Sequence, residues 1–81
     1  SSNMFKLYGG YTEIEKGRVY KDSEKNVVVL GNDAAYELWG KDQANVGNKI
    51  LINGEKYRVV GILKKIGSSL SQTDDNAIYI P

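Results

Sequence analysis

The sequence predicts a small α+β domain: a mostly antiparallel β-sheet with one short helix and an Asn-Gly hairpin. Three observations carry this prediction. Val27–Leu30 is a run of branched apolar residues without alternation, which is typical of a strand covered on both faces. A segment of good helix propensity begins at about Asp33 and ends at Trp39. Asn53-Gly54 stands between two strand-forming runs, the strongest short-range signal for a hairpin.

Several further strands are expected around this core. Apolar residues 4–8 end at a Gly-Gly pair, which predicts a first strand and a turn. Residues 11–14 continue the sheet, and polar residues 21–25 form a surface turn before the buried strand. Residues 77–80 close the sheet. The intervening residues 67–76 are rich in Ser, Gln and Asp, and we expect them to form the most mobile segment.

The helix is expected to depend on the sheet, because a helix of about two turns does not persist alone. A side chain at its start, Asn32 or Asp33, is predicted to cap it, and Gly40 is predicted to end it in the left-handed conformation. One apolar stripe should pack on the sheet, with Leu38 and Trp39 as its main contacts. The stripe consists of Ala35, Leu38 and Trp39.

The hairpin has a predicted register. A type I′ turn at Asn53-Gly54 places Ile52 opposite Glu55 and Ile50 opposite Tyr57. Gly61, inside the second strand, indicates a bulge or a close approach of another backbone.

Composition argues against most catalytic chemistry. The 81 residues suit one compact core, and they contain neither His nor Cys, which removes the usual proton shuttle, the thiolate nucleophile and the commonest soft metal ligands. The net charge is +1, with both signs interspersed, so nucleic acid is not an expected partner. We therefore predict no catalytic, cofactor-binding or metal-binding residue. No apolar run approaches the roughly 20 residues that span a bilayer.

The remaining candidates for chemistry also have structural explanations. Val27–Leu30 leading through Gly31 into a helix mimics a dinucleotide-binding turn, but the two other spaced glycines are missing. Carboxylate pairs in polar contexts are expected to be solvated surface. They are Asp74 with Asp75, Asp22 with Glu24, and Glu13 with Glu15. A basic patch is likewise expected to be only a solvated strand end. Its candidates are Lys16, Arg18, Lys64 and Lys65.

From Val27 onward, the chain resembles the MacB-like periplasmic core domain of FtsX-type ABC transporter permeases. The resemblance rests on Val27–Leu30 with Gly31, on Leu38-Trp39-Gly40 where the family usually has Leu-Phe-Gly, and on a hairpin similar to the family's. That hairpin comprises Val46-Gly47, Ile50, Ile52, Gly54 and Tyr57-Arg58-Val59-Val60-Gly61-Ile62-Leu63. Residues 75–81 are similar to a closing "D-vyiP", and Gly17-Arg18-Val19-Tyr20 is similar to Gly-Arg-x-Phe. Asn45 departs from the family's usual Pro before Val-Gly.

The resemblance implies that residues 1–81 are a single extracytoplasmic subdomain, a fragment of a larger membrane permease. It implies a dimeric parent whose transmembrane helices and cytoplasmic ATPase lie outside this chain. The domain would be non-catalytic, would bind no cofactor, would relay ATP-driven conformational change, and would contact substrate or partner proteins on the periplasmic or cell-surface side. We expect the isolated domain to be monomeric.

Two further expectations concern surfaces and chain ends. Partner contacts are expected at residues 67–76 and at the Asn53-Gly54 tip, because loops on a rigid sheet are common contact sites. If the chain is an insertion in a larger domain, Phe5 and Ile80 should lie within roughly 15 Å, with their strands paired or flanking one neighbour. The alternative is a stand-alone β-rich module that binds nucleic acid or peptide through Tyr8, Tyr11 and Tyr57.

Overall fold

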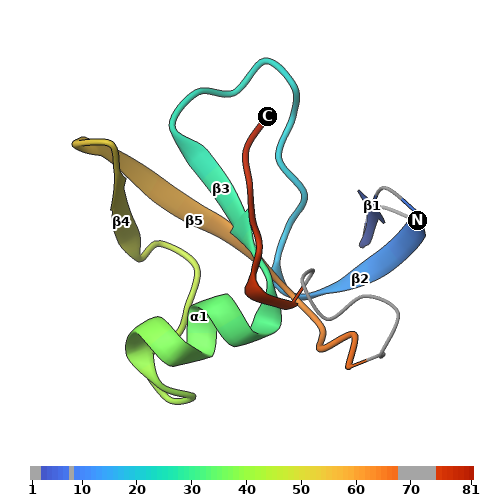
Figure 1. Ribbon diagram of the computed structural model, residues 1–81. Coiled ribbons are helices and arrows are strands. Elements are labelled where there is room, and N and C mark those ends of the chain that lie inside the picture. The colour runs from blue at the N-terminus through green and yellow to red at the C-terminus, as the bar shows by residue number, and fades with distance from the viewer. Residues whose placement is uncertain (1–2, 8, 68–74) are drawn as a thin grey trace.

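The computed structural model describes residues 3–7, 9–67 and 75–81. These residues form a sheet and one helix, which confirms the α+β prediction (Figure 1). The elements in order are β1 (Met4–Leu7), β2 (Gly10–Gly17), β3 (Val27–Leu30), α1 (Asn32–Trp39), β4 (Lys49–Ile52), β5 (Glu55–Leu63) and β6 (Ile78–Tyr79).

Strand β5 is the centre of the sheet. It pairs antiparallel with β2 and β4, and parallel with β3. The strand order is β1-β2-β5-β3-β6, and β4 pairs with β5 off this path. The sheet is therefore mostly antiparallel, as predicted. The parallel pair was not predicted; β5, the second strand of the hairpin that follows the helix, lies beside β3.

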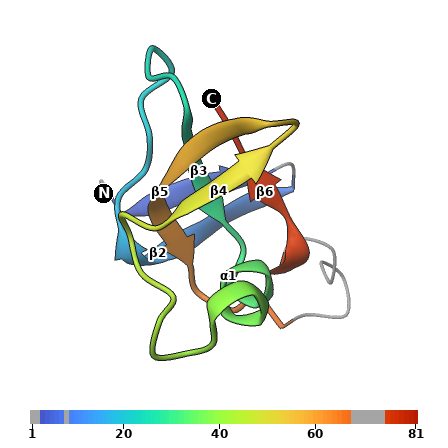
Figure 2. The same ribbon diagram turned by 90° about the vertical axis from the view of Figure 1, so that its left-hand side faces the viewer.

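Each face of β3 and β5 belongs to a different core, and this explains the unbroken apolar run of β3. The core opposite the helix contains Val27 and Val29 of β3, and β1 covers it with Phe5. The helix-side core contains Val28 and Leu30, together with the buried Ala35 of α1. Helix α1 lies beneath the sheet in both ribbon views (Figures 1 and 2).

Helix α1 packs on the sheet as predicted, but only two of the three residues of the predicted apolar stripe make this contact. Ala35 is fully buried, and Trp39 and Tyr36 pack on the helix-side core. Leu38 is 56% exposed, so its predicted contact with the sheet is wrong. Tyr36 takes this place because the helix is rotated so that positions 35, 36 and 39 face the sheet.

The predicted cap is also wrong. Gly31 is the N-cap residue and makes no side-chain capping bond. The buried Asn32 instead donates its Nδ2 to the Leu63 carbonyl oxygen at 3.0 Å and to Glu15 Oε1 at 3.2 Å. Gly40 ends the helix with a positive φ of 80°, but its ψ of 164° is extended and not the predicted left-handed value.

The hairpin has the predicted register and turn. Ile52 lies opposite Glu55 and Ile50 opposite Tyr57, and the two turn residues, Asn53 and Gly54, have φ of 50° and 84°. These positive values are those of a type I′ turn.

Gly61 marks both features that the sequence predicted, a bulge and a close backbone approach. Val28 pairs with Val59 whereas Val29 pairs with Gly61, which leaves Val60 as the extra residue of a bulge. A Cβ on Gly61 would overlap the carbonyl oxygen of Arg18. Across the β2–β5 ladder, Gly17 pairs with Gly61, and a Cβ on Gly17 would overlap the Val60 carbonyl oxygen. The two glycines therefore let β2 lie unusually close to β5.

The first and last strands do not pair with each other, so that form of the insertion prediction is wrong. β1 pairs with β2, and β6 pairs with β3, so they share no neighbour either. The sheet curves, however, and the Phe5 ring meets the Tyr79 ring edge-on at 5.1 Å between centroids. Phe5 also meets Tyr20 at 5.7 Å, and the Tyr20 hydroxyl donates to the Ile80 carbonyl oxygen at 3.0 Å. Side chains thus join the first strand to the segment around β6.

Candidate interaction face

One face of the β4–β5 hairpin presents four side chains to solvent. Side chains alternate between the two faces of a strand, and Ile50, Ile52 and Tyr57 pack on the helix-side core. The opposite face of the hairpin therefore carries the remaining residues, all of them exposed. They form two cross-strand pairs, Lys49 with Arg58 and Leu51 with Lys56.

A fifth residue joins this face because Asn26 fixes the preceding loop to β5. Asn26 has a φ of 57°, a left-handed conformation that Asn tolerates better than most residues. Its side-chain amide donates to the Lys56 carbonyl oxygen at 3.0 Å, and its own carbonyl accepts from the Arg58 amide at 2.9 Å. These two bonds hold Lys25 beside the hairpin. We call Lys25, Lys49, Lys56 and Arg58 the basic face.

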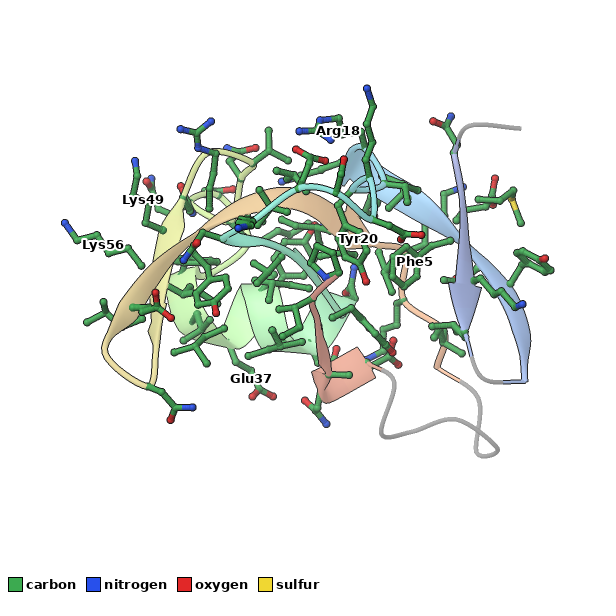
Figure 3. All side chains as sticks on the ribbon, turned by 90° about the horizontal axis from the view of Figure 1, so that it is seen from above. Phe5, Arg18, Tyr20, Glu37, Lys49 and Lys56 are labelled. Atoms are coloured by element: carbon green, nitrogen blue, oxygen red, sulfur yellow. The ribbon has the colours of Figure 1, made fainter. Side chains whose placement is uncertain are left out.

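The basic face borders a shallow groove of about 410 Å³. All four of its cations line the groove. The rest of the lining is Glu24, Asn26, the buried Val27, and Tyr57, whose side chain packs on the helix-side core. Figure 3 shows Lys49 and Lys56 pointing away from the body of the domain.

The carboxylate in the groove is already engaged. Glu24 accepts from both terminal nitrogens of Arg18, at 2.8 and 2.9 Å, and from the Lys21 backbone amide at 2.8 Å. The hydrogen bond from Arg18, followed by the one from the Lys21 amide, lowers the pKa of Glu24 to about 2. Its negative charge is therefore matched by Arg18 and does not balance the basic face.

The basic residues that the sequence singled out do not form a patch, as expected. Lys64 pairs with Glu13 at 3.1 Å and Lys65 pairs with Asp33 at 2.6 Å. The hydrogen bond to Asp33 raises the pKa of Lys65. Lys16 donates to the Ala44 carbonyl oxygen at 2.8 Å and lies over the Tyr36 ring. With Arg18 bound to Glu24, each of these cations has its own local partner.

The carboxylate pairs do not converge on a reaction site, but each pair has a member held by hydrogen bonds and is not the simple solvated surface that was expected: Glu24, Asp75 and Glu15. Asp75 is only 3% exposed, and its two oxygens accept from the Ile66 and Gly67 amides at 2.8 and 2.9 Å. Glu15 accepts from Asn32 and, at 2.6 Å, from the Tyr36 hydroxyl. That hydrogen bond raises the pKa of Tyr36 to about 12. Asp74 lies outside the described residues.

The aromatic stacking face of the alternative hypothesis is not assembled. Tyr57 packs against the helix-side core, and Tyr11 is 66% exposed near the start of β2. Because β2 meets β5 only from Ile14 onward, at Leu63, the two rings lie toward opposite ends of the sheet. Tyr8 lies outside the described residues. Tyr79 packs on the core opposite the helix.

One of the two predicted contact loops can be placed. The Asn53-Gly54 tip lies at the exposed end of the β4–β5 hairpin, on the side of the domain away from β1 and β2 (Figure 1). Of residues 67–76, the segment 68–74 lies outside the described residues. The basic face was missed by the sequence reasoning. Its signal was nevertheless present, because the predicted register already set Lys49 against Arg58 and Lys56 against Leu51.

Two further observations bear on the class of protein. Among residues 3–7, 9–67 and 75–81, no three potential metal-ligating side chains gather. In the same part of the chain, no helix has the length and apolar character to cross a membrane.

Three relatives of this chain are named as ABC transporter permeases. An uncharacterized ABC transporter permease of Methanocaldococcus jannaschii is 44% identical over 71 residues, which cover 88% of this chain and 16% of the relative. The macrolide export ATP-binding/permease protein MacB of Bdellovibrio bacteriovorus is 33% identical, over 80% of this chain and 10% of the relative. An uncharacterized ABC transporter permease of Bacillus subtilis, YknZ, is 32% identical, over 85% of this chain and 18% of the relative.

The family itself is established over the full sequence. Residues 1–81 match the MacB-like periplasmic core domain, and the chain belongs to this family of extracytoplasmic permease domains. It spans less than a fifth of the length of the relatives described above. No solved structure matches the chain.

Proposed function

We propose that residues 1–81 are a single extracytoplasmic subdomain of a larger ABC transporter permease. In this role the domain relays ATP-driven conformational change and contacts substrate or partner proteins outside the membrane, without a catalytic residue, cofactor or metal of its own. Its partners are the transmembrane helices and cytoplasmic ATPase of its parent, and an extracytoplasmic protein. The family membership and the permease relatives support this proposal.

The observation that carries the relay is the position of β5. This strand is hydrogen-bonded to β2, β3 and β4, so one ladder joins the β1–β2 hairpin to the β4–β5 hairpin. Residues Val59 to Leu63 of β5 are buried between the two cores. Because close-packed interiors have low compressibility, a displacement at one hairpin moves the other with it.

Side-chain contacts extend this rigidity beyond the ladder. Asn32 and Glu15 tie the start of α1 to β5 and β2, and Phe5 ties β1 to Tyr79 of β6. The domain is thereby suited to move as one body.

The test uses the complete permease with its ATPase in lipid nanodiscs, with native cysteines removed. A spin label at Asn53, the hairpin tip, reports the distance between the two copies in the dimer that the family resemblance implies. Pulsed electron paramagnetic resonance with and without a non-hydrolysable ATP analogue should show a change of several ångströms, on the scale of domain motions.

A second labelled pair controls for rigidity. Labels at Asn53 and Lys6, on the two hairpins of one copy, should keep the same separation in both nucleotide states. An unchanged distance between copies refutes the relay, and a changed distance within one copy refutes movement as a rigid body.

A further inference from the structure

We propose that the basic face binds an acidic, extended segment of an extracytoplasmic partner protein. The inference rests on the proposed function and deepens it, because it names the chemistry of the partner and moves the contact from the hairpin tip to the outer face of the hairpin.

First, repulsion between like charges on the basic face costs free energy. Lys49 and Arg58 lie directly opposite each other on β4 and β5, an arrangement of like charges that destabilises a sheet. Lys56 lies opposite Leu51 on the same face of the hairpin, and Lys25 lines the same groove as the other three cations. None of these four cations forms an ion pair with a carboxylate in the part of the chain that the structure describes.

Lys6, Lys16, Lys21 and Lys41 also form no such ion pair in the described residues, so what distinguishes the basic face is that its four cations line one groove. Arg18, Lys64 and Lys65 each have a carboxylate at 2.6–3.1 Å. Glu55, the acidic residue nearest in sequence to Lys56, pairs with Ile52 on the opposite face of the hairpin. An external anion is therefore what would offset the repulsion within the basic face.

The second step is the apolar surface among the cations. Leu51 is 68% exposed, and Val46, which is 43% exposed, shares a shallow depression with Arg58. Exposed apolar side chains rimmed by charge are typical of protein contact sites. A segment that mixes carboxylates with apolar side chains would satisfy both features.

The third step is shape. All four cations line one groove between the loop that carries Asn26 and the β4–β5 hairpin, so an extended chain lying in it can reach every one of these charges. A flat bilayer surface would reach the outward-pointing tips of Lys49 and Lys56 (Figure 3) but would not enter the groove that all four cations line. The geometry thus favours an acidic polypeptide over anionic lipid headgroups.

The experiment measures binding of the 81-residue chain to a short fluorescein-labelled peptide in which Glu alternates with Ala, by fluorescence anisotropy. Binding should be at least about tenfold weaker in about 0.3 M salt than in about 0.02 M salt, because exposed charges are screened. It should be absent for the same peptide with Gln in place of Glu. The variant Lys56→Glu/Arg58→Glu should bind at least about tenfold more weakly.

The matched control is Lys6→Glu/Lys41→Glu, on β1 and after α1. Each double reversal changes the net charge by −4, from +1 to −3, so the two variants differ only in where the charge lies. The control should retain binding within about twofold. Thermal unfolding checks that each variant folds. If Lys56→Glu/Arg58→Glu does not fold, the milder Lys49→Gln/Lys56→Gln variant replaces it in the binding measurement.

An equal loss of binding in both double variants, or no binding by the wild-type chain, overturns the proposal. Preference for phosphatidylglycerol vesicles over the peptide, in co-sedimentation, also overturns it in favour of headgroup binding. None of these outcomes touches the nucleotide-dependent distance change, so failure of the acidic-segment proposal is distinguishable from failure of the relay.

Discussion

The close approach of β2 and β5 makes Gly61→Ala a sharp test of the fold. The added Cβ would lie below 3.0 Å from the Arg18 carbonyl oxygen, a distance that real Cβ atoms do not show. It would also lie 3.3 Å from both Ile14 Cδ1 and Val29 Cγ2. The neighbour in conflict is backbone, so relief requires β2 to move away from β5.

The expected cost combines three contributions. Overpacking of a filled core costs about 1–3 kcal/mol. Separation of the strands weakens the hydrogen bond from the Arg18 amide to the Val60 carbonyl, now 2.9 Å, by about 1 kcal/mol. The reduced entropy of the unfolded chain returns about 0.4–1 kcal/mol. The free energy of unfolding should therefore fall by about 1–4 kcal/mol, and the melting temperature by about 5–30 °C in a domain of this size.

Urea and thermal unfolding, followed by far-UV circular dichroism and Trp39 fluorescence, measure this change. The matched control is Gly9→Ala, where an added Cβ meets nothing within 4 Å and φ is not positive. This control should be neutral or stabilised by up to about 1 kcal/mol. If Gly61→Ala is as stable as Gly9→Ala, the close approach does not constrain position 61 and the argument fails.

Three further predictions concern polar and apolar contacts. Asp75→Ala should lower the free energy of unfolding by about 2–4 kcal/mol in chemical denaturation, because two backbone amides lose a charged acceptor; a change below about 0.5 kcal/mol would contradict this. Glu24→Gln should lower the melting temperature at pH 7, and the difference from wild type should vanish as pH falls from about 4.5 toward about 2, because a depressed carboxyl pKa stabilises the fold only while the group is ionised. A difference that persisted at low pH would argue against the Arg18 contact. Leu38→Ala should change stability by less than about 0.5 kcal/mol, whereas Ile62→Ala, in the buried core, should cost about 2–5 kcal/mol; similar costs for both would show that Leu38 is packed.

Local sequence patterns were enough to predict the features that depend on neighbouring residues. The Asn53-Gly54 turn set the register of β4 and β5, because only a few residue types accept positive φ at both turn positions. The apolar run of β3 showed that both of its faces are covered, and Gly61 marked a bulge and a tight contact. These signals are local, so they could be interpreted without knowing what packs against them.

Long-range packing sets which side chains meet across the fold. Asn32 and Asp33 are equally plausible helix caps by residue type. In the structure the Asn32 side-chain amide donates to the Leu63 carbonyl oxygen instead, and Gly31 is the N-cap residue. Leu38 fits a helical stripe, yet the rotation of α1 against the sheet exposes it. Asp75 is polar in sequence but buried, because the Ile66 and Gly67 amides turn toward it.

The same distinction explains the basic face. The register of the hairpin could place Lys49 beside Arg58 and Lys56 from the sequence alone, but Lys25 joins them only because Asn26 fastens a distant loop to β5. The pairing of Glu24, the carboxylate that lines the groove, with Arg18 also depends on the tertiary structure. Periodicity reports which face of a strand a residue occupies. Only the folded chain sets which opposite charge lies within reach, because that distance depends on how separate segments pack.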